Sequence, residues 1–239
     1  MPDPASAETL PLGPVVDPTP RPLPARVPHR GRSVDLEPLH PRHVPELWQA
    51  TAAGTPAGDP SWAYLGYGPF ASEAALRGFV GGFATAHDPM AWAVRPHRSG
   101  TADGWLTLMD IQPGNAAIEI GNIWFGPRMQ RSRAATEAMA LLMRHAMDDL
   151  GYRRLLWKCN ALNAPSRRAA ERLGFTYEGT LRAHMVVKGR RRDTAMFSIL
   201  AEEWPARGAA LASWLDDANF GPDGQAKRSL GEIFREALS

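Results

Sequence analysis

Three strand-like segments followed by a switch to helical spacing constrain the fold of this chain more than any other feature. The strand-like segments are residues 90–94, 105–111 and 117–125. They are separated by Asp103-Gly104 and Pro113-Gly114-Asn115, which are typical hairpin turns. After Pro127 the apolar residues recur at helical spacing, and residues 155–159 return to a strand pattern. This order predicts an antiparallel meander, then a helix, then a further strand.

The helix between the strands that end at Phe125 and Cys159 predicts a crossover connection. Because a right-handed crossover places its two strands parallel, these strands are expected to pair in parallel within an otherwise antiparallel sheet. A short helix after Asn163 and two final strands, 177–187 and 194–201, complete the pattern. We therefore predict an α/β (α+β) fold with a mixed, mostly antiparallel central sheet flanked by helices.

The two ends of the chain differ from its middle. Nine of the 22 prolines lie in the first 30 residues, so residues 1–32 are expected to form an extended Pro-rich arm. This arm is either a disordered leader or a segment laid across a neighbouring surface. Residues 33–204 are expected to form the main domain. Residues 205–239 return to helical spacing, and these helices complete the core or form a partner surface, with a homodimer as one candidate assembly.

The charge balance and residue usage exclude several function classes. Lys and Arg number 27 against 25 Asp and Glu, which is too balanced for an obligatory nucleic-acid or membrane-surface binder. The single cysteine, Cys159, excludes an intramolecular disulfide and a thiolate metal cluster, and the histidines lack metal-ligand spacing, so no metal is expected. Neither a membrane-spanning apolar run nor a secretory signal is visible, which makes the cytoplasm the expected location.

The segment from Phe125 to Ala138 carries the most informative local pattern. A strand leads through Gly126-Pro127 and small residues into a helix N-terminus. Unpaired amides and the positive end of the helix dipole can hold a pyrophosphate there. Taken alone, the same pattern also fits an ordinary helix start with solvated arginines.

With two further motifs, this order of elements resembles the GCN5-related N-acetyltransferase (GNAT) superfamily. More narrowly, it resembles the ribosomal-protein N-terminal acetyltransferase, or RimJ/RimL-like, branch. The three motifs are Gln130–Ala138 at the pyrophosphate-loop position, Asn163-Ala164-Pro165-Ser166 followed by Glu171–Phe175, and Tyr177-Glu178-Gly179. The resemblance covers residues 33–204 and implies a parallel strand pair that splays apart to admit pantetheine.

The resemblance implies acetyl-CoA as co-substrate and assigns a set of binding residues. They are Ile123, Trp124 and Phe125 for pantetheine and the thioester oxyanion, the loop Gln130, Arg131, Ser132, Arg133, Ala134, Ala135 and Thr136 for pyrophosphate, and Asn163 for pantetheine. Arg133 stands where the family usually has glycine, and the guanidinium groups of Arg131 and Arg133 are expected to pair with phosphate. Thr136 is expected either to cap the helix or to contact phosphate.

Acetyl transfer to an amine needs a base and a proton donor. Many family members place a tyrosine donor where this chain has Ala170, so the resemblance assigns the donor role to Ser166, with helix capping as its alternative. Glu178 is the favoured base, in a partly buried setting that raises its pKa. Glu119 is the competitor, although it could equally lie on a solvated sheet face. Cys159 is expected to be a small buried hydrophobe.

The resemblance therefore implies an acetyl-CoA-dependent N-acetyltransferase. The acceptor is a primary amine, with an α-amine favoured, on a protein N-terminus, a peptide, an amino acid or a small molecule, and it attacks the thioester directly. A non-catalytic acyl-CoA-binding module is the alternative suggested by Ala170 and Arg133. A nucleic-acid-associated protein is less favoured, because aromatic residues do not alternate with the arginine clusters.

Overall fold

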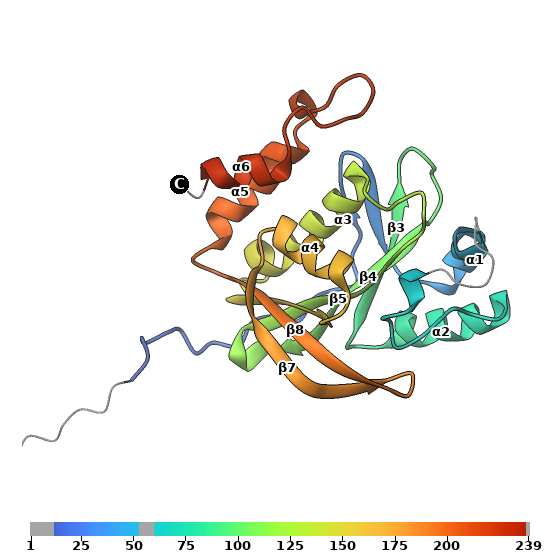
Figure 1. Cartoon of the computed structure of the whole chain (residues 1–239), viewed down its shortest axis with the longest axis horizontal. Helices are drawn as coiled ribbons and strands as arrows, with labels where there is room; N and C mark the ends of the chain where they lie inside the picture. Colours follow the sequence, from blue (N-terminus) through green and yellow to red (C-terminus); the bar gives the residue numbers. More distant parts are fainter. Residues whose placement is uncertain (1–11, 53–59, 238–239) are drawn as a thin grey trace, which may run out of the picture.

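The computed structural model describes residues 12–52 and 60–237, and its centre is an eight-stranded sheet (Figure 1). The strands are β1 (His29–Arg30), β2 (Val34–Pro38), β3 (Met90–Pro96), β4 (Gly104–Gln112), β5 (Ala117–Phe125), β6 (Arg154–Asn160), β7 (Thr176–Val187) and β8 (Arg190–Leu200). Their order is β1-β2-β3-β4-β5-β6-β8-β7. In the described part of the chain β5 and β6 pair in parallel and every other neighbouring pair is antiparallel. The predicted mixed sheet with one parallel pair is confirmed.

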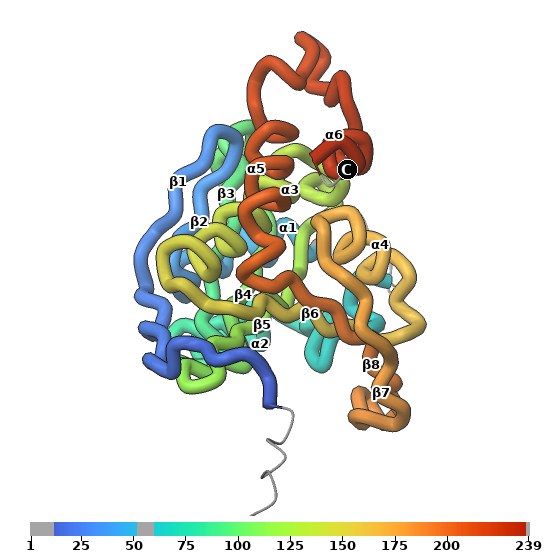
Figure 2. The backbone as a smooth tube through the Cα atoms, turned by 90° about the vertical axis from the view of Figure 1, so that its left-hand side faces the viewer, coloured from blue at the N-terminus to red at the C-terminus, as the bar shows by residue number. Residues whose placement is uncertain are grey.

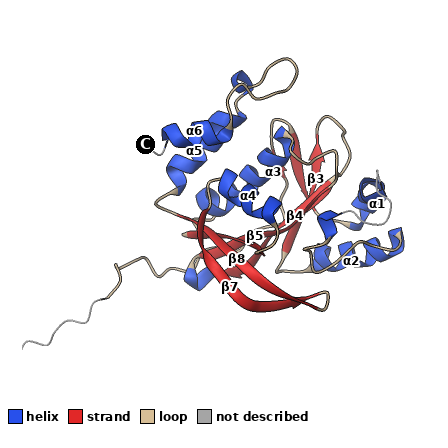
Figure 3. Ribbon diagram, viewed as in Figure 1, coloured by secondary structure: helices blue, strands red, loops and turns tan. Residues whose placement is uncertain are grey.

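Helices cover both faces of this sheet (Figure 3). They are α1 (Val44–Ala52), α2 (Glu73–Thr85), α3 (Arg133–Arg144), α4 (Ala164–Arg172), α5 (Trp204–Leu215) and α6 (Leu230–Ala237). The first two lie on one face and the other four on the opposite face. The sheet therefore separates two apolar layers.

The larger apolar layer is built around α3, the crossover helix between β5 and β6. Its apolar residues follow the predicted helical spacing, and Ala138, Met139 and Leu142 are buried against the sheet. A π-helical turn over His145–Asp149 extends it, and Gly151, with φ of 68°, follows in the left-handed region that suits glycine. This helix sets how β5 and β6 sit beside each other.

The smaller apolar layer lies under α1 and α2. Leu47, Leu76 and Val80 are fully buried there. Ser72 caps α2, because its hydroxyl accepts a hydrogen bond from the Ala75 amide at 3.1 Å. The loop between these helices contains Trp62, which packs into the core, while residues 53–59 of the loop lie outside the described residues.

Most of the described part of the Pro-rich arm, residues 12–32, lies against its own chain, while its first residues, including Leu12 and Val15, are exposed. The Tyr152 hydroxyl donates to the Pro22 carbonyl at 3.2 Å and the Trp92 indole donates to the Val27 carbonyl at 2.8 Å. The arm then adds β1, the edge strand that the sequence patterns did not predict, through the non-proline residues His29 and Arg30. Figure 2 shows this segment running along the sheet up to β1.

The two C-terminal helices complete the larger apolar layer. Leu211 and Trp214 of α5 and Leu230 and Phe234 of α6 are buried in the same cluster as α3. This outcome matches the first of the two predicted roles for the segment. Helix α5 also lies over α3 in the view of Figure 2, which brings the C-terminal segment close to the start of α3.

Candidate active site

The parallel strands β5 and β6 part soon after they begin. Their pairing in the described structure joins residues 117–119 of β5 to residues 154–156 of β6 and stops there. Beyond that point β5 stays with β4, through the pair Trp105 and Trp124, while β6 stays with β8. The predicted splay is therefore present. It opens toward the N-terminal ends of α3 and α4, the two helices that follow these strands.

The β5 backbone at the splay carries a bulge. Three residue steps on β5, from Gly121 to Trp124, face two steps on β4, and Asn122 adopts a left-handed φ of 48°. Tyr67 fixes this bulge, because its buried hydroxyl donates to the Asn122 carbonyl at 3.2 Å and accepts the Trp105 indole at 3.1 Å. The sequence patterns did not single out Asn122 or its contact with Tyr67, because the two residues are 55 positions apart.

The three residues predicted to bind pantetheine sit on this bulged stretch. The Trp124 side chain is buried and stacks on Trp62 with ring centroids 4.7 Å apart. Ile123 and Phe125 pack against the larger apolar layer on the other face. Both side-chain directions are therefore fixed by packing, which holds the intervening backbone rigid beside the opening.

The loop from Gln130 to Ser132 joins this strand to α3. The Gln130 side-chain amide donates to the Phe125 carbonyl at 3.0 Å, and Arg131 adopts a left-handed φ of 59°. Ser132 caps the helix by accepting from the Ala135 amide at 3.0 Å. Within the described structure the amides of Arg133 and Ala134 make no hydrogen bond. Unpaired amides at a helix start are suited to an anionic group.

The Arg133 side chain differs from expectation. Its guanidinium donates to Asp217 at 2.6 Å and to the Leu215 carbonyl, and it lies 4.1 Å from the centre of the Phe220 ring. The C-terminal segment thus holds the group that was expected to pair with phosphate. Arg131 is exposed and stays available for that role.

Thr136 does not cap α3, so the capping interpretation is wrong. Ser132 occupies the cap position, and the buried Thr136 hydroxyl accepts a hydrogen bond from Arg172 of α4 at 3.1 Å. The reason is position, because Thr136 lies one full turn inside the helix. Its side chain joins α3 to α4.

Glu119 is the last β5 residue paired with β6 and is buried, with 5% of its surface exposed. Its carboxylate lies 2.9 Å from Lys158 Nζ of β6, and that ammonium lies 2.5 Å from Asp110 of β4. Burial raises the pKa of Glu119, although Lys158 opposes the shift. Gly121 makes room for this carboxylate, because a Cβ there would lie 3.1 Å from Glu119 Oε1. The expectation of a solvated face is therefore wrong for Glu119.

Glu178 lies in a different environment. It sits on the edge strand β7, accepts Arg154 through both guanidinium nitrogens, one at 2.7 Å, and accepts the Ser198 hydroxyl at 2.7 Å. The Arg154 hydrogen bonds lower the pKa of Glu178. The expectation that burial raises this pKa is wrong, because the edge strand leaves the side chain partly open to solvent beside a cation.

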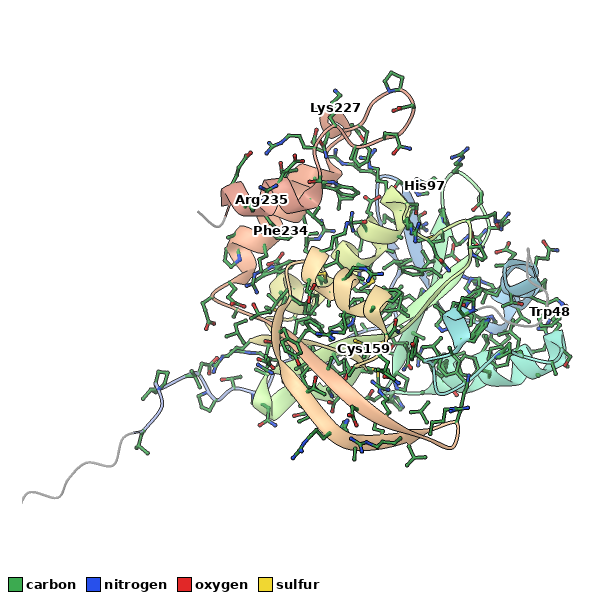
Figure 4. All side chains as sticks on the ribbon, viewed as in Figure 1. Trp48, His97, Cys159, Lys227, Phe234 and Arg235 are labelled. Carbon is green, nitrogen blue, oxygen red and sulfur yellow. The ribbon has the colours of Figure 1, made fainter. Side chains whose placement is uncertain are left out.

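Asn163 and Ser166, at the start of α4, have different roles in the structure. Asn163 is the helix cap, accepting the Ser166 amide at 3.2 Å through Oδ1. The capping alternative for Ser166 is therefore wrong. The Ser166 hydroxyl instead accepts the Trp157 indole at 3.1 Å and also forms a hydrogen bond with the Cys159 sulfur. Cys159 beside it is buried in the interior of the molecule (Figure 4), and burial raises the pKa of its thiol.

Loop contacts close over the same region. Lys188, at the tip of the β7–β8 hairpin, donates to the carbonyls of Trp62 and Gly68 at 2.8 and 2.6 Å. The Tyr64 hydroxyl donates to the Leu162 carbonyl at 3.2 Å. The α1–α2 loop is thereby tied to both the hairpin and the β6–α4 loop.

Two general features bear on the chemistry. Among the described residues no cluster of His, Cys, Asp and Glu is arranged to hold a metal ion. None of the described helices is both long and apolar enough to span a membrane.

The charged residues near the splay that the sequence patterns missed are Lys158 and Asp110. The sequence did hold one signal for Lys158, since it is the only charged residue among the otherwise apolar residues 155–159.

Comparison with known proteins gives a consistent result. The model of the acetyltransferase (GNAT) domain family matches residues 34–176. The crystal structure of a GCN5-related N-acetyltransferase from Brucella melitensis is 45% identical, covers 91% of this chain and 98% of that chain, and superposes with a TM-score of 0.87. A provisionally assigned GNAT-family acetyltransferase from Chromobacterium violaceum is 39% identical over 85% of this chain and 100% of that chain, with a TM-score of 0.73.

A curated relative adds a functional name. A Bacillus subtilis protein provisionally named ribosomal N-acetyltransferase YdaF is 30% identical over 105 residues, which are 44% of this chain. The match spans 57% of the length of that protein. The name agrees with the RimJ/RimL-like branch that the sequence motifs resemble.

Proposed function

Since this chain belongs to the GNAT acetyltransferase family, we propose that it is an acetyl-CoA-dependent enzyme that acetylates the α-amine of a protein N-terminus. The observation that carries the proposal is a buried carboxylate, Glu119, at the point where β5 and β6 part. A base is needed beside a reacting amine, and burial is what makes a carboxyl group competent near neutral pH.

The residues present fit acetyl-CoA. The bulged backbone of Ile123, Trp124 and Phe125 would face pantetheine and donate to the thioester oxygen as negative charge develops on it. Asn163 uses Oδ1 for the helix cap and keeps its amide hydrogens for pantetheine. The amides of Arg133 and Ala134, with the Arg131 side chain, would hold the pyrophosphate.

Direct attack requires two proton transfers. The acceptor nitrogen forms a bond to the acetyl carbon, the carbon–sulfur bond breaks, and CoA departs as a thiolate. Glu119 takes the proton from the amine, through a water where the amine does not reach it directly. Ser166 gives its hydroxyl proton to the thiolate, and the Trp157 indole that donates to the Ser166 oxygen favours the resulting negative charge.

The acceptor class is supported by relatedness rather than by a bound molecule. The Bacillus subtilis relative carries a ribosomal N-acetyltransferase name. A protein N-terminus offers an α-amine with an ordinary pKa of about 7.7–8.0, so a useful fraction is neutral near pH 7. A lysine ε-amine, near 10.4, is almost fully protonated there.

The test is acetyl transfer to matched peptides. Purified protein and acetyl-CoA are incubated with peptides that carry a free N-terminus, a blocked N-terminus with an internal lysine, or both amines, and products are identified by mass spectrometry. We expect acetylation at free N-termini only. Acetylation of the blocked peptide would overturn the α-amine assignment. Tight acetyl-CoA binding without transfer to any acceptor would favour the non-catalytic alternative.

A further inference from the structure

Lys158 lies between two carboxylates at the splay. Its ammonium lies 2.9 Å from Glu119 and 2.5 Å from Asp110. The three residues come from β6, β5 and β4, so they meet across three adjacent strands of the sheet. A cation held this way cannot move toward one carboxylate without leaving the other.

Asp110 is held in place by its own backbone. It adopts a left-handed φ of 46° at an irregularity in the β4–β5 register, where a non-glycine residue is strained. Asp88 fixes this turn by accepting the Asp110 and Ile111 amides, both at 3.0 Å. Gln112 donates to the second Asp110 oxygen at 2.8 Å. The Asp110 carboxylate is thereby aimed at Lys158 from a rigid support.

The charged groups that face Glu119 act in opposite directions. Lys158 from β6 and Arg192 from β8 favour the ionised carboxylate, while Asp110 from β4 and burial itself disfavour it. Without Lys158, burial beside a second carboxylate would keep Glu119 protonated at higher pH, and a protonated carboxyl cannot accept a proton. Lys158 therefore affects the pH above which Glu119 is ionised and able to accept a proton.

We propose that Lys158 is a positioning residue that sets the pH at which Glu119 ionises, and that Asp110 tempers this effect by sharing the lysine. The inference rests on the proposed role of Glu119 as the base. It predicts that removing Lys158 raises the titration midpoint of Glu119, whereas removing the Asp110 charge lowers it. A purely structural role would not produce shifts in opposite directions.

The test is a carbon-13 NMR titration of glutamate carboxyl groups in the whole protein without substrate. The signal absent from E119Q is assigned to Glu119. In K158M its midpoint should rise by about one to three pH units. In D110N the midpoint should fall, because a like charge is lost and the lysine is free to pair fully with Glu119. K158R keeps the cation, so the Glu119 midpoint in this variant should stay close to the wild-type value.

The pH dependence of kcat/KM provides the link to catalysis, and its acidic limb should follow the NMR midpoint in each variant. Because the titration needs no turnover, it separates the two ideas. If E119Q keeps full activity, the proposed base is wrong, whatever the titration shows. If folded K158M and D110N leave the midpoint unmoved, or if they move it in the same direction, the inference about Lys158 is overturned.

Discussion

The two ends of the opening between β5 and β6 hold charge in opposite ways. At the end that we propose carries out the chemistry, the chemical end, three charged residues come from adjacent strands: Glu119, Lys158 and Asp110. The carboxylate of Glu119 is buried. At the end formed by residues 130–136, which we propose binds phosphate and call the phosphate end, Arg131 is exposed and Arg133 is bound by Asp217, 84 residues away. Buried charge must be compensated by its immediate neighbours, whereas charge at the surface can be captured by any segment that packs nearby.

The comparison predicts the largest effect at the chemical end. E119Q should lower kcat by about 10²-fold or more while acetyl-CoA affinity stays nearly constant, because the amide cannot take the proton. E178Q is the matched control, and its kcat should change little, since Arg154 holds that carboxylate ionised at the sheet edge. Steady-state kinetics and calorimetry check both. A large loss of kcat in E178Q with no loss in E119Q would show that Glu178, and not Glu119, is the base.

S166A should give a smaller effect at the same end. Its kcat should fall by less than the roughly 10²-fold typical of a lost acid, because water can replace a hydroxyl. The melting temperature should fall by a few degrees even though Asn163 provides the cap, because the buried Trp157 indole loses its hydrogen-bond acceptor. N163A is the contrast, with about 1 kcal/mol less stability from the lost cap. Rates measured beside melting curves separate these effects, and a wild-type kcat in folded S166A would contradict the role of Ser166 as proton donor.

At the phosphate end, substitutions of the two arginines should affect CoA affinity to different extents. R131A should weaken CoA binding about tenfold, the value of one charge-assisted hydrogen bond, and leave pantetheine binding unchanged. R133A should change CoA affinity much less, because its guanidinium is engaged by Asp217 and Phe220. Calorimetry with CoA and with pantetheine measures both. Equal losses in the two variants would show that Arg133 leaves the C-terminal segment to bind phosphate.

The smallest expected effect tests that segment. D217N removes a largely exposed partner of Arg133 and should cost about 0.2–1 kcal/mol, which lowers the melting temperature by a few degrees at most. D223N, on an exposed turn of the same segment, is the control and should melt like wild type. A scanning calorimetry trace that gives D217N the same melting temperature as D223N would show that the ion pair adds nothing to docking.

The sequence by itself determined the architecture of this protein. Hairpin turns, the change to helical spacing after Pro127, and the bounds of Ala117–Phe125 all follow from patterns within a few residues. The parallel pairing of β5 and β6 follows from chain order and the handedness of crossovers. The motif near Asn163 placed its helix start correctly, since a capping asparagine acts on a neighbour three residues away.

Only the tertiary structure decided which charged groups are available for chemistry. Glu178 matches a family motif, yet Arg154 of another strand lowers its pKa. We propose Glu119 as the base instead, because burial raises its pKa although Lys158 opposes the shift. Arg133 likewise met Asp217 from the far end of the chain. Such contacts join residues that are distant in sequence, and a carboxylate or guanidinium takes its properties from burial and neighbouring charge, which residue order does not specify.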